Sequence, residues 1–447
     1  MIRDKSFYRA FFTMAAILVL QNIITISVNL ADNLMLGAFR ESALSGAAAV
    51  NQVQFVFQQI VFAFGEATVI MATQYFGKRE MKPIPKLSAL GMRFAIGTAV
   101  FLFFLTSFFP HAVISVFTTD ETIIAEGCAY LRIIRFTYPV FAVTQILLAT
   151  LRSTGMVSIS LILSLVALVT NGGINYTLIY GHFGAPRLGI TGAAIGTLTA
   201  RILELVILIL YIRKKEKNLS LSWRKYLHLD PALIKGYVKV MLPVLFTNAM
   251  WGFNIAAQNA ILGHMTARAI AANSVASTMF LLVKSAAIGS ASASAFFGGK
   301  TIGAGNMENL KRLARTLQVI FIGIGILAGM VLFVIRIPIL SFYNLEAATK
   351  EMANRFLLIL SVIVATMSYQ MPVNAGIIRG GGGTLYCMLL DLISIWGIVI
   401  PCSFVLAFVR KASPVAVVWM LNADQMFKCI PAFLKVNFGH WAKKLTG

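Results

Sequence analysis

Residues 11–37 read FFTMAAILVLQNIITISVNLADNLMLG, a run in which Asp32 is the only charged side chain. A helix needs about 20 predominantly apolar residues to cross a bilayer, so this run is long enough to do so. Its polar residues, among them Gln21 and Asn22, interrupt the short apolar core that a cleavable signal peptide would need. The stretch therefore predicts a retained membrane span with a buried acid.

Apolar runs of this kind recur along the whole chain of 447 residues, which is 58% hydrophobic and only 12% charged. Its mean hydropathy is +0.82, and a soluble protein would carry about twice this charged fraction. We therefore predict an all-α polytopic membrane protein with twelve transmembrane helices. The expected spans cover residues 11–37, 47–76, 88–110, 125–150, 157–181, 189–212, 237–263, 271–297, 313–336, 352–378, 385–408 and 413–434.

The net charge of +22 lies mainly in alternate connections between the expected spans. Lys and Arg are dense at residues 78–86 and 213–235 and sparse in the intervening connections. By the positive-inside rule, this alternation predicts an even number of spans with both termini in the cytoplasm. It is typical of a multi-pass protein of the plasma (inner) membrane, and it excludes nucleic-acid binding as the main function.

The two halves of the chain are related by a gapless offset of 226 residues. With this offset Leu36-Gly37 aligns with Leu262-Gly263, and Gly77 aligns with Gly303. Repeats of six spans each are parallel, and such repeats place a substrate site between them near the middle of the membrane. The prediction is two pseudo-symmetric six-helix lobes around a central cavity, at 1–212 and 237–434, with a cytoplasmic linker at 213–236 and a cytoplasmic tail at 435–447.

Asp32 is the strongest candidate for function. Polar groups at membrane depth need a partner or water, and an acid buried there is functional by default. Asp32 can carry a proton and, when ionised, can hold Na⁺ or a cationic substrate. Asn29 lies one turn away, and Asn171 and Asn175 on the fifth span can complete an oxygen-rich pocket. The alternative is a structural acid satisfied by neighbouring helices.

Other polar residues in the expected spans of both halves favour a shared cavity. The candidate cavity or substrate residues are Asn33, Gln59, Glu66, Asn254, Gln258 and Lys284. Glu66 lies toward the cytoplasmic end of its span, so it either only lines a vestibule or takes part in function. Lys284, aligned with Gln58 of the first half, either repels cations, holds an anionic group or pairs with Asp391.

Two pairs of opposite charge are interpreted as structural bridges. Asp424 and Lys428 are four residues apart, and Arg201 and Glu204 are three apart, so each pair shares a helix face. The four cysteines and five histidines are scattered and form no ligand or catalytic motif. We expect no enzyme activity, no cofactor, and no metal site other than Asp32 if Na⁺ is the coupling ion.

Several short motifs together resemble the multidrug and toxic compound extrusion (MATE) family of the MOP flippase superfamily. The stretch from Asn29 to Gly37 resembles the family's "VDtxmxG" signature. Gln74-Tyr-Phe-Gly77 and Gly303-Ala-Gly-Asn306 match its paired loops, and Leu151-Arg-Ser-Thr-Gly155 and Arg379-Gly-Gly-Gly-Gly-Thr384 resemble its "LRGxGDT" turns. The resemblance covers essentially the whole chain.

The resemblance implies two lobes around a V-shaped cavity that alternates its access under a Na⁺ or H⁺ gradient. Asp32 then matches the span 1 aspartate implicated in coupling, and Asn171 and Asn175 match the polar pair on span 5. Some members have a second aspartate on span 5, where this chain has Asn175. Others use acids on spans 7 and 10, where this chain has none. These departures favour a coupling site in the first lobe only and leave the ion open.

The leading hypothesis is a secondary active antiporter that exports organic, cationic or amphipathic compounds in exchange for H⁺ or Na⁺. The alternative is a lipid-linked precursor flippase of the same superfamily, which would favour several basic residues in the cavity to hold a diphosphate. A membrane-embedded transferase or scaffold would need a catalytic constellation that the sequence lacks. The expected partners are small-molecule substrates and membrane lipid, and the family suggests a monomer.

Overall fold

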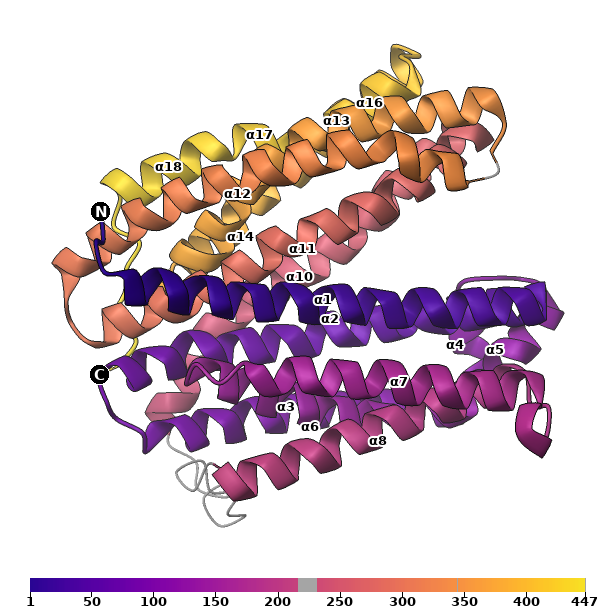
Figure 1. The fold of residues 1–447 in the computed structure, drawn as a ribbon, viewed down its shortest axis with the longest axis horizontal. Coiled ribbons are helices and arrows are strands. Elements are labelled where there is room, and N and C mark those ends of the chain that lie inside the picture. The colour runs from indigo at the N-terminus through magenta and orange to yellow at the C-terminus, as the bar shows by residue number, and fades with distance from the viewer. Residues whose placement is uncertain (216–230, 344, 447) are drawn as a thin grey trace. The chain divides into compact units, whose positions relative to one another are not determined.

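The computed structural model describes residues 1–215, 231–343 and 345–446. Within these ranges the regular structure is helical, with no β-strand (Figure 1). Residues 216–230, most of the predicted cytoplasmic linker, lie outside the described residues.

The helices of the first half follow the expected spans, except that the span predicted at 125–150 is divided into two helices. They are α1 (Lys5–Phe39), α2 (Glu41–Gly77), α3 (Pro83–Phe108), α4 (Pro110–Ser115), α5 (Glu121–Ile134), α6 (Thr137–Ser153), α7 (Ser158–Tyr180), the short η1 (His182–Gly184) and α8 (Ile190–Lys215). Asp120 caps α5 by accepting hydrogen bonds from the backbone N–H groups of Thr122 and Ile123. Gly181 ends α7 in a left-handed conformation that suits glycine.

In the described residues, the second half has more helical segments than the first, because several of its helical runs are divided. They are α10 (Pro231–Met265), α11 (Ala267–Gly303), α12 (Met307–Phe342), α13 (Ala347–Met371), η3 (Pro372–Ile378), α14 (Thr384–Asp391), η4 (Leu392–Val399), α15 (Ile400–Phe404), η5 (Val405–Val409), α16 (Pro414–Leu421), α17 (Asp424–Phe427) and α18 (Cys429–Phe438). The η3, η4 and η5 segments are π-helical turns within longer helical runs.

Ten of the described helices are long and apolar enough to cross a membrane, or up to eleven if the bent pair of α5 and α6 forms one span. That pair bends by 53°, because Pro139 cannot donate to the carbonyl of Arg135. The predicted span at 413–434 consists of three short helices, α16, α17 and α18, and is not a single long one. Pro431 leaves the carbonyl of Phe427 without its helical donor at the second of these breaks.

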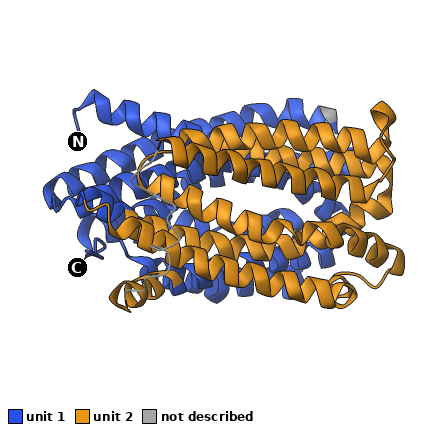
Figure 2. Cartoon of the chain, turned by 90° about the horizontal axis from the view of Figure 1, so that it is seen from below, with its two compact units in different colours: residues 1–19, 73–79, 242–447 blue, residues 20–72, 80–241 orange. Residues whose placement is uncertain are grey.

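The chain divides into two compact units, coloured separately in Figure 2. Unit 2 comprises Leu20–Ala72 and Glu80–Met241 and holds most of the predicted first lobe. Unit 1 comprises Met1–Val19, Thr73–Arg79 and Leu242–Gly447, and so combines the predicted second lobe with the start of α1 and the end of α2.

The ends of α2 and α11 cross inside unit 1 with the symmetry that the repeat predicts. A Cβ on Gly77 would overlap the carbonyl oxygen of Lys300, and a Cβ on Gly303 would overlap that of Gln74. Both the two glycines and the two carbonyl residues are 226 apart, so the contacts are reciprocal, as at a two-fold axis. The geometry confirms the offset found in the sequence and requires glycine at both positions.

We expect Gly303→Ala to destabilise the protein by about 1–3 kcal/mol, because the added methyl group must push two backbones apart. Gly298→Ala on the same helix is the matched control, since a Cβ there meets nothing within 4 Å. The melting temperature of the purified variants measures the difference. Equal melting temperatures for the two variants would contradict the close crossing.

The C-terminal tail is fastened to this crossing. The side-chain amide of Gln74 donates to the carbonyl of Lys443 at 3.0 Å, and its oxygen accepts from the N–H of Leu445 at 2.8 Å. The N–H of Lys443 donates to the carbonyl of Gly381 at 2.8 Å. The indole of Trp441 is only 6% exposed and lies against Gly381. Residues 439–446 are therefore an ordered strap within unit 1.

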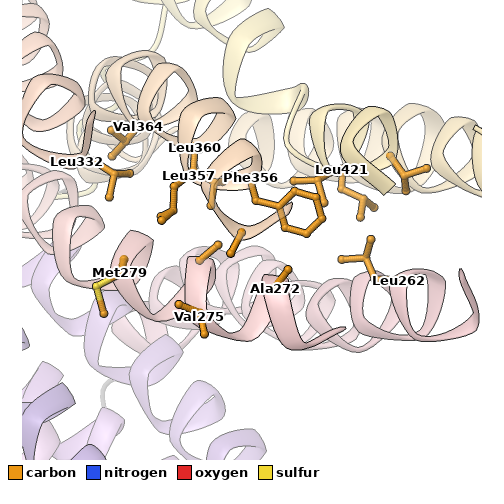
Figure 3. Packing of buried hydrophobic residues seen from close by; sticks show 14 of the residues in the cluster. Leu262, Ala272, Val275, Met279, Leu332, Phe356, Leu357, Leu360, Val364 and Leu421 are labelled. Atoms are coloured by element: carbon orange, nitrogen blue, oxygen red, sulfur yellow. The ribbon is translucent and has the colours of Figure 1, made fainter. Parts of the chain in front are cut away.

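A hydrophobic cluster holds the helices of the second half together (Figure 3). Leu262 of α10, Val275 and Met279 of α11, and Phe356 and Leu360 of α13 are all buried in it. Leu332 of α12 and Leu421 of α16 extend the cluster. Tight packing between helices is a main source of stability inside a bilayer, because lipid is as apolar as these side chains.

Candidate functional site

A polar pocket lies inside unit 2, between α1, α2, α5, α7 and α8. Its volume is about 60 Å³, which is room for a few water molecules or a bare ion. Drug-sized ligands occupy cavities of about 300–1,000 Å³, so the pocket in this conformation is of ion size. It is lined by Thr25, Val28, Asn29, Asp32, Asn51, Gln54, Gln58, Tyr130, Ser164, Ala167, Asn171, Thr197, Ala200, Arg201 and Glu204.

Asp32 is held by a chain of amide hydrogen bonds. The Nδ2 of Asn175 donates to Oδ1 of Asp32 at 2.6 Å and also lies 3.2 Å from Oδ1 of Asn171. The Nδ2 of Asn171 in turn donates to the hydroxyl of Thr197 at 3.2 Å. Asn171 and Asn175 share a face of α7 because they are four residues apart. Both are almost fully buried, at 2% and 0% exposure, so the chain is rigid.

The charged groups that line the pocket leave one net negative charge when all are ionised. Arg201 pairs with Glu204 at 2.8 Å and also acts electrostatically on Asp32. The guanidinium of Arg201 further lies 5.3 Å from the centre of the Phe141 ring. Two carboxylates against one guanidinium favour the uptake of one proton or one monovalent cation, because an uncompensated charge is costly at membrane depth.

The structure brings the four predicted coupling residues together. Asn29, Asp32 and Asn171 line the pocket. Asn175 is not among the lining residues but hydrogen-bonds Asp32. Arg201 and Glu204 form the predicted bridge, and that bridge belongs to the same pocket.

Three of the predicted cavity residues of the first half are not among those lining this pocket. Asn33 is exposed, and Gln59 and Glu66 lie elsewhere on α2. Glu66 interacts electrostatically with Arg152 at the end of α6.

The predicted residues of the second half lie in unit 1. Gln258 donates to Oδ1 of Asn254 at 3.3 Å, and Lys284 lies over the ring of Trp251. Asp391 pairs with Lys428 at 2.8 Å and not with Lys284, which removes one of the three alternatives for Lys284.

Sequence reasoning missed several lining residues. Tyr130 is buried and hydrogen-bonds Thr197, and the spacing of residues in the sequence pointed to neither. Gln54 could have been found, because Asn51, Gln54 and Gln58 recur at the spacing of one helix face.

Gly196 of α8 leaves room for the side chain of Asn175 on α7, which hydrogen-bonds Asp32. A Cβ at Gly196 would overlap Oδ1 of Asn175. We expect Gly196→Ala to displace this amide and weaken the binding of the coupling ion. A hydrogen bond to a charged group is worth about 1.5–3 kcal/mol, so the loss is about tenfold to a hundredfold.

The concentration of coupling ion that gives half-maximal transport measures this effect. Gly173→Ala on α7 is the control, since a Cβ there meets nothing within 4 Å. Unchanged ion dependence in Gly196→Ala would mean that Asn175 does not position Asp32.

No group of three or more His, Cys, Asp or Glu residues that could hold a metal ion occurs in the described part of the chain. Glu204 is paired with Arg201, so Asp32 is the lining carboxylate that amide and hydroxyl groups surround, which suits a proton or a monovalent cation.

In the described residues, two related helical halves and an acid in a polar pocket are features of membrane transporters. The MatE family model matches residues 18–177 and 243–405, one segment in each half. The chain belongs to the MatE family, as its motifs indicated.

Curated relatives and solved structures agree with this assignment. The chain is 26% identical over 369 residues to "Probable multidrug resistance protein YoeA" of Bacillus subtilis, covering 80% of this chain and 77% of that protein. It is 25% identical over 427 residues to "Probable multidrug resistance protein NorM" of Thermotoga maritima, covering 95% and 91%.

Among solved structures, the Vibrio cholerae MATE transporter VcmN in its bent form superposes with a TM-score of 0.85 at 16% identity, covering 97% of each chain. A MATE protein in complex with MaL6 gives a TM-score of 0.87 at 14% identity, covering 96% of this chain and 95% of that one. These structural likenesses establish the fold.

Proposed function

We propose that the protein is a secondary active antiporter that exports small organic compounds in exchange for H⁺ or Na⁺, with Asp32 as the coupling residue. The observation that carries the proposal is the net negative charge of the ion-sized pocket around Asp32. The names of the relatives, which are multidrug resistance proteins, support small-molecule drugs as the exported class.

The coupling depends on whether a proton or Na⁺ neutralises the single net negative charge of the Asp32 pocket. A proton or Na⁺ at Asp32 neutralises the pocket, and the amides of Asn171 and Asn175 supply the neutral polar surroundings that either ion needs. An ion drives a conformational change only through its different affinity for the two states. MATE proteins of the same fold have been solved in a bent and in a straight conformation, which supports a two-state cycle with alternating access.

We also propose a plasma-membrane location with both termini in the cytoplasm, from the distribution of Lys and Arg between the spans. A monomer suffices for the mechanism, because the Asp32 pocket is lined entirely by residues of one unit of one chain. The protein then acts without a cofactor, and the coupling ion is its only inorganic partner.

The test is transport in vesicles that contain the purified protein. A fluorescent organic cation is loaded, and either a pH gradient or a Na⁺ gradient is imposed across the membrane. We expect one gradient to drive export above the level of protein-free vesicles, and that gradient identifies the ion. An export rate that is the same with and without either gradient would contradict the antiport mechanism.

A further inference from the structure

Lys284 and Lys428 both lie well inside helical spans of the second half, and their surroundings differ. Lys428 has a side-chain exposure of 3% and donates to Asp391 at 2.8 Å and to Asp424 at 2.9 Å. Its charge is fully compensated by protein carboxylates. Lys428 is therefore a structural lysine whose charge is already paired inside the protein.

Lys284 lies near the middle of α11 without such a partner. No carboxylate in the described residues comes within ion-pair distance of its ammonium, and Asp424 acts on it only at longer range. The side chain is partly buried, and its Nζ lies 4.9 Å from the centre of the Trp251 ring on α10. A cation–π contact of this kind attracts the ammonium but occupies none of its three N–H groups as a conventional acceptor would.

Burying a lysine ammonium at membrane depth without a paired anion costs free energy, unless a ligand supplies the missing negative charge. An anionic group is the matching ligand, because charge-assisted hydrogen bonds from an ammonium are roughly twice as strong as neutral ones. The Trp251 ring beside the ammonium adds a flat apolar surface for an aromatic body. Asn254 and Gln258 follow Trp251 at i+3 and i+7, on the same face of α10, and supply polar groups near it.

We propose that Lys284 and Trp251 form a subsite for the carboxylate, or a similar anionic group, of an aromatic amphipathic substrate. The subsite extends the range of exported compounds from simple cations to zwitterions and aromatic acids. This inference rests on the proposed export function and names a substrate class for it.

The experiment compares two dyes that differ only at one group: a rhodamine with a free carboxylate and its methyl ester. Binding to the purified full-length protein in neutral detergent is measured by fluorescence anisotropy. We expect Lys284→Met to lower affinity for the free acid by about tenfold to a hundredfold and to leave the ester unchanged. Lys284→Arg, which keeps the charge, retains binding of the acid.

The role of the ring is tested with Trp251→Leu and Trp251→Phe. Trp251→Leu should weaken both dyes, because the flat surface is lost, and Trp251→Phe should weaken them less. Melting temperatures of all variants show whether each is folded. Equal losses of acid and ester in a folded Lys284→Met variant would overturn the proposal, as would full binding of the acid.

Anionic phospholipid is the other source of the same chemistry, so the binding is repeated with phosphatidylglycerol added. Displacement of the acid by this lipid, dependent on Lys284, would assign the subsite to a lipid headgroup and overturn the substrate assignment. The assay needs no gradient. Failure of gradient-driven export of the ester would contradict the antiport mechanism only. The difference in binding between the two dyes tests the subsite independently.

Discussion

Replacement of Asp32 with asparagine is expected to reduce gradient-driven export by at least about tenfold, to near the level of protein-free vesicles. Asparagine has nearly the same shape as aspartate and can still meet the amide of Asn175, which lies 2.6 Å from the carboxylate in the structure. It cannot exchange a proton or carry the charge that holds Na⁺. An ion that binds both states equally shifts no equilibrium, so the gradient loses its effect.

Glu41→Gln is the matched control for Asp32→Asn. Glu41 is an exposed acid in the first turn of α2, on the same pair of helices, and it should transport like the wild type. Equilibrium binding of the dye should survive in Asp32→Asn, which separates a coupling defect from a folding defect. Full gradient-driven export by this variant would move coupling to another acid, with Glu66 and Asp391 the first to examine.

Lys428→Met is expected to cause the largest loss of stability, about 3–5 kcal/mol. The substitution keeps the volume of the side chain but removes the charge between Asp391 and Asp424. The carboxylate of Asp424 has an exposure of only 5%, so it would remain buried with the neutral side-chain amide of Gln425 donating to it at 2.7 Å. Removing one partner of a buried ion pair costs more than removing both.

The melting temperature of the purified protein measures this loss, with Lys444→Met as a control at an exposed tail position. The double variant Asp424→Asn/Lys428→Met should recover part of the stability, because it buries one charge fewer. A melting temperature unchanged in Lys428→Met would show that the bridge contributes nothing. In that case the contrast between Lys428 and Lys284 would lose its basis.

Contacts within one helix could be predicted from the sequence. The spacing of Asp424 and Lys428 and that of Arg201 and Glu204 placed each pair on one face, and both bridges are present. Internal repetition gave the register of the α2–α11 crossing, because Gly77 and Gly303 occupy the same place in each half. These features depend on the helix period or on the internal repeat, and both can be recognised from residue spacing in the sequence.

Contacts between different helices could be predicted only where a polar residue had few possible partners. Asp32 is the single acid in its span, so the buried amides of Asn171 and Asn175 were natural partners. Asp391 had several basic residues within reach, and the sequence could not choose Lys428 over Lys284. Tyr130 lies on α5, and no residue spacing in the sequence links it to the face of α2 that carries Gln54.

The strap formed by residues 439–446 has a consequence for the order of folding. The amide of Gln74 finds its partners at Lys443 and Leu445, which are 369 and 371 residues later in the chain. Contacts between residues so distant in sequence close the longest loops and form late, since their entropic cost is met only after the intervening helices are in place. The side chain of Gln74 at the end of α2 therefore gains these partners only after nearly the whole chain has been synthesised.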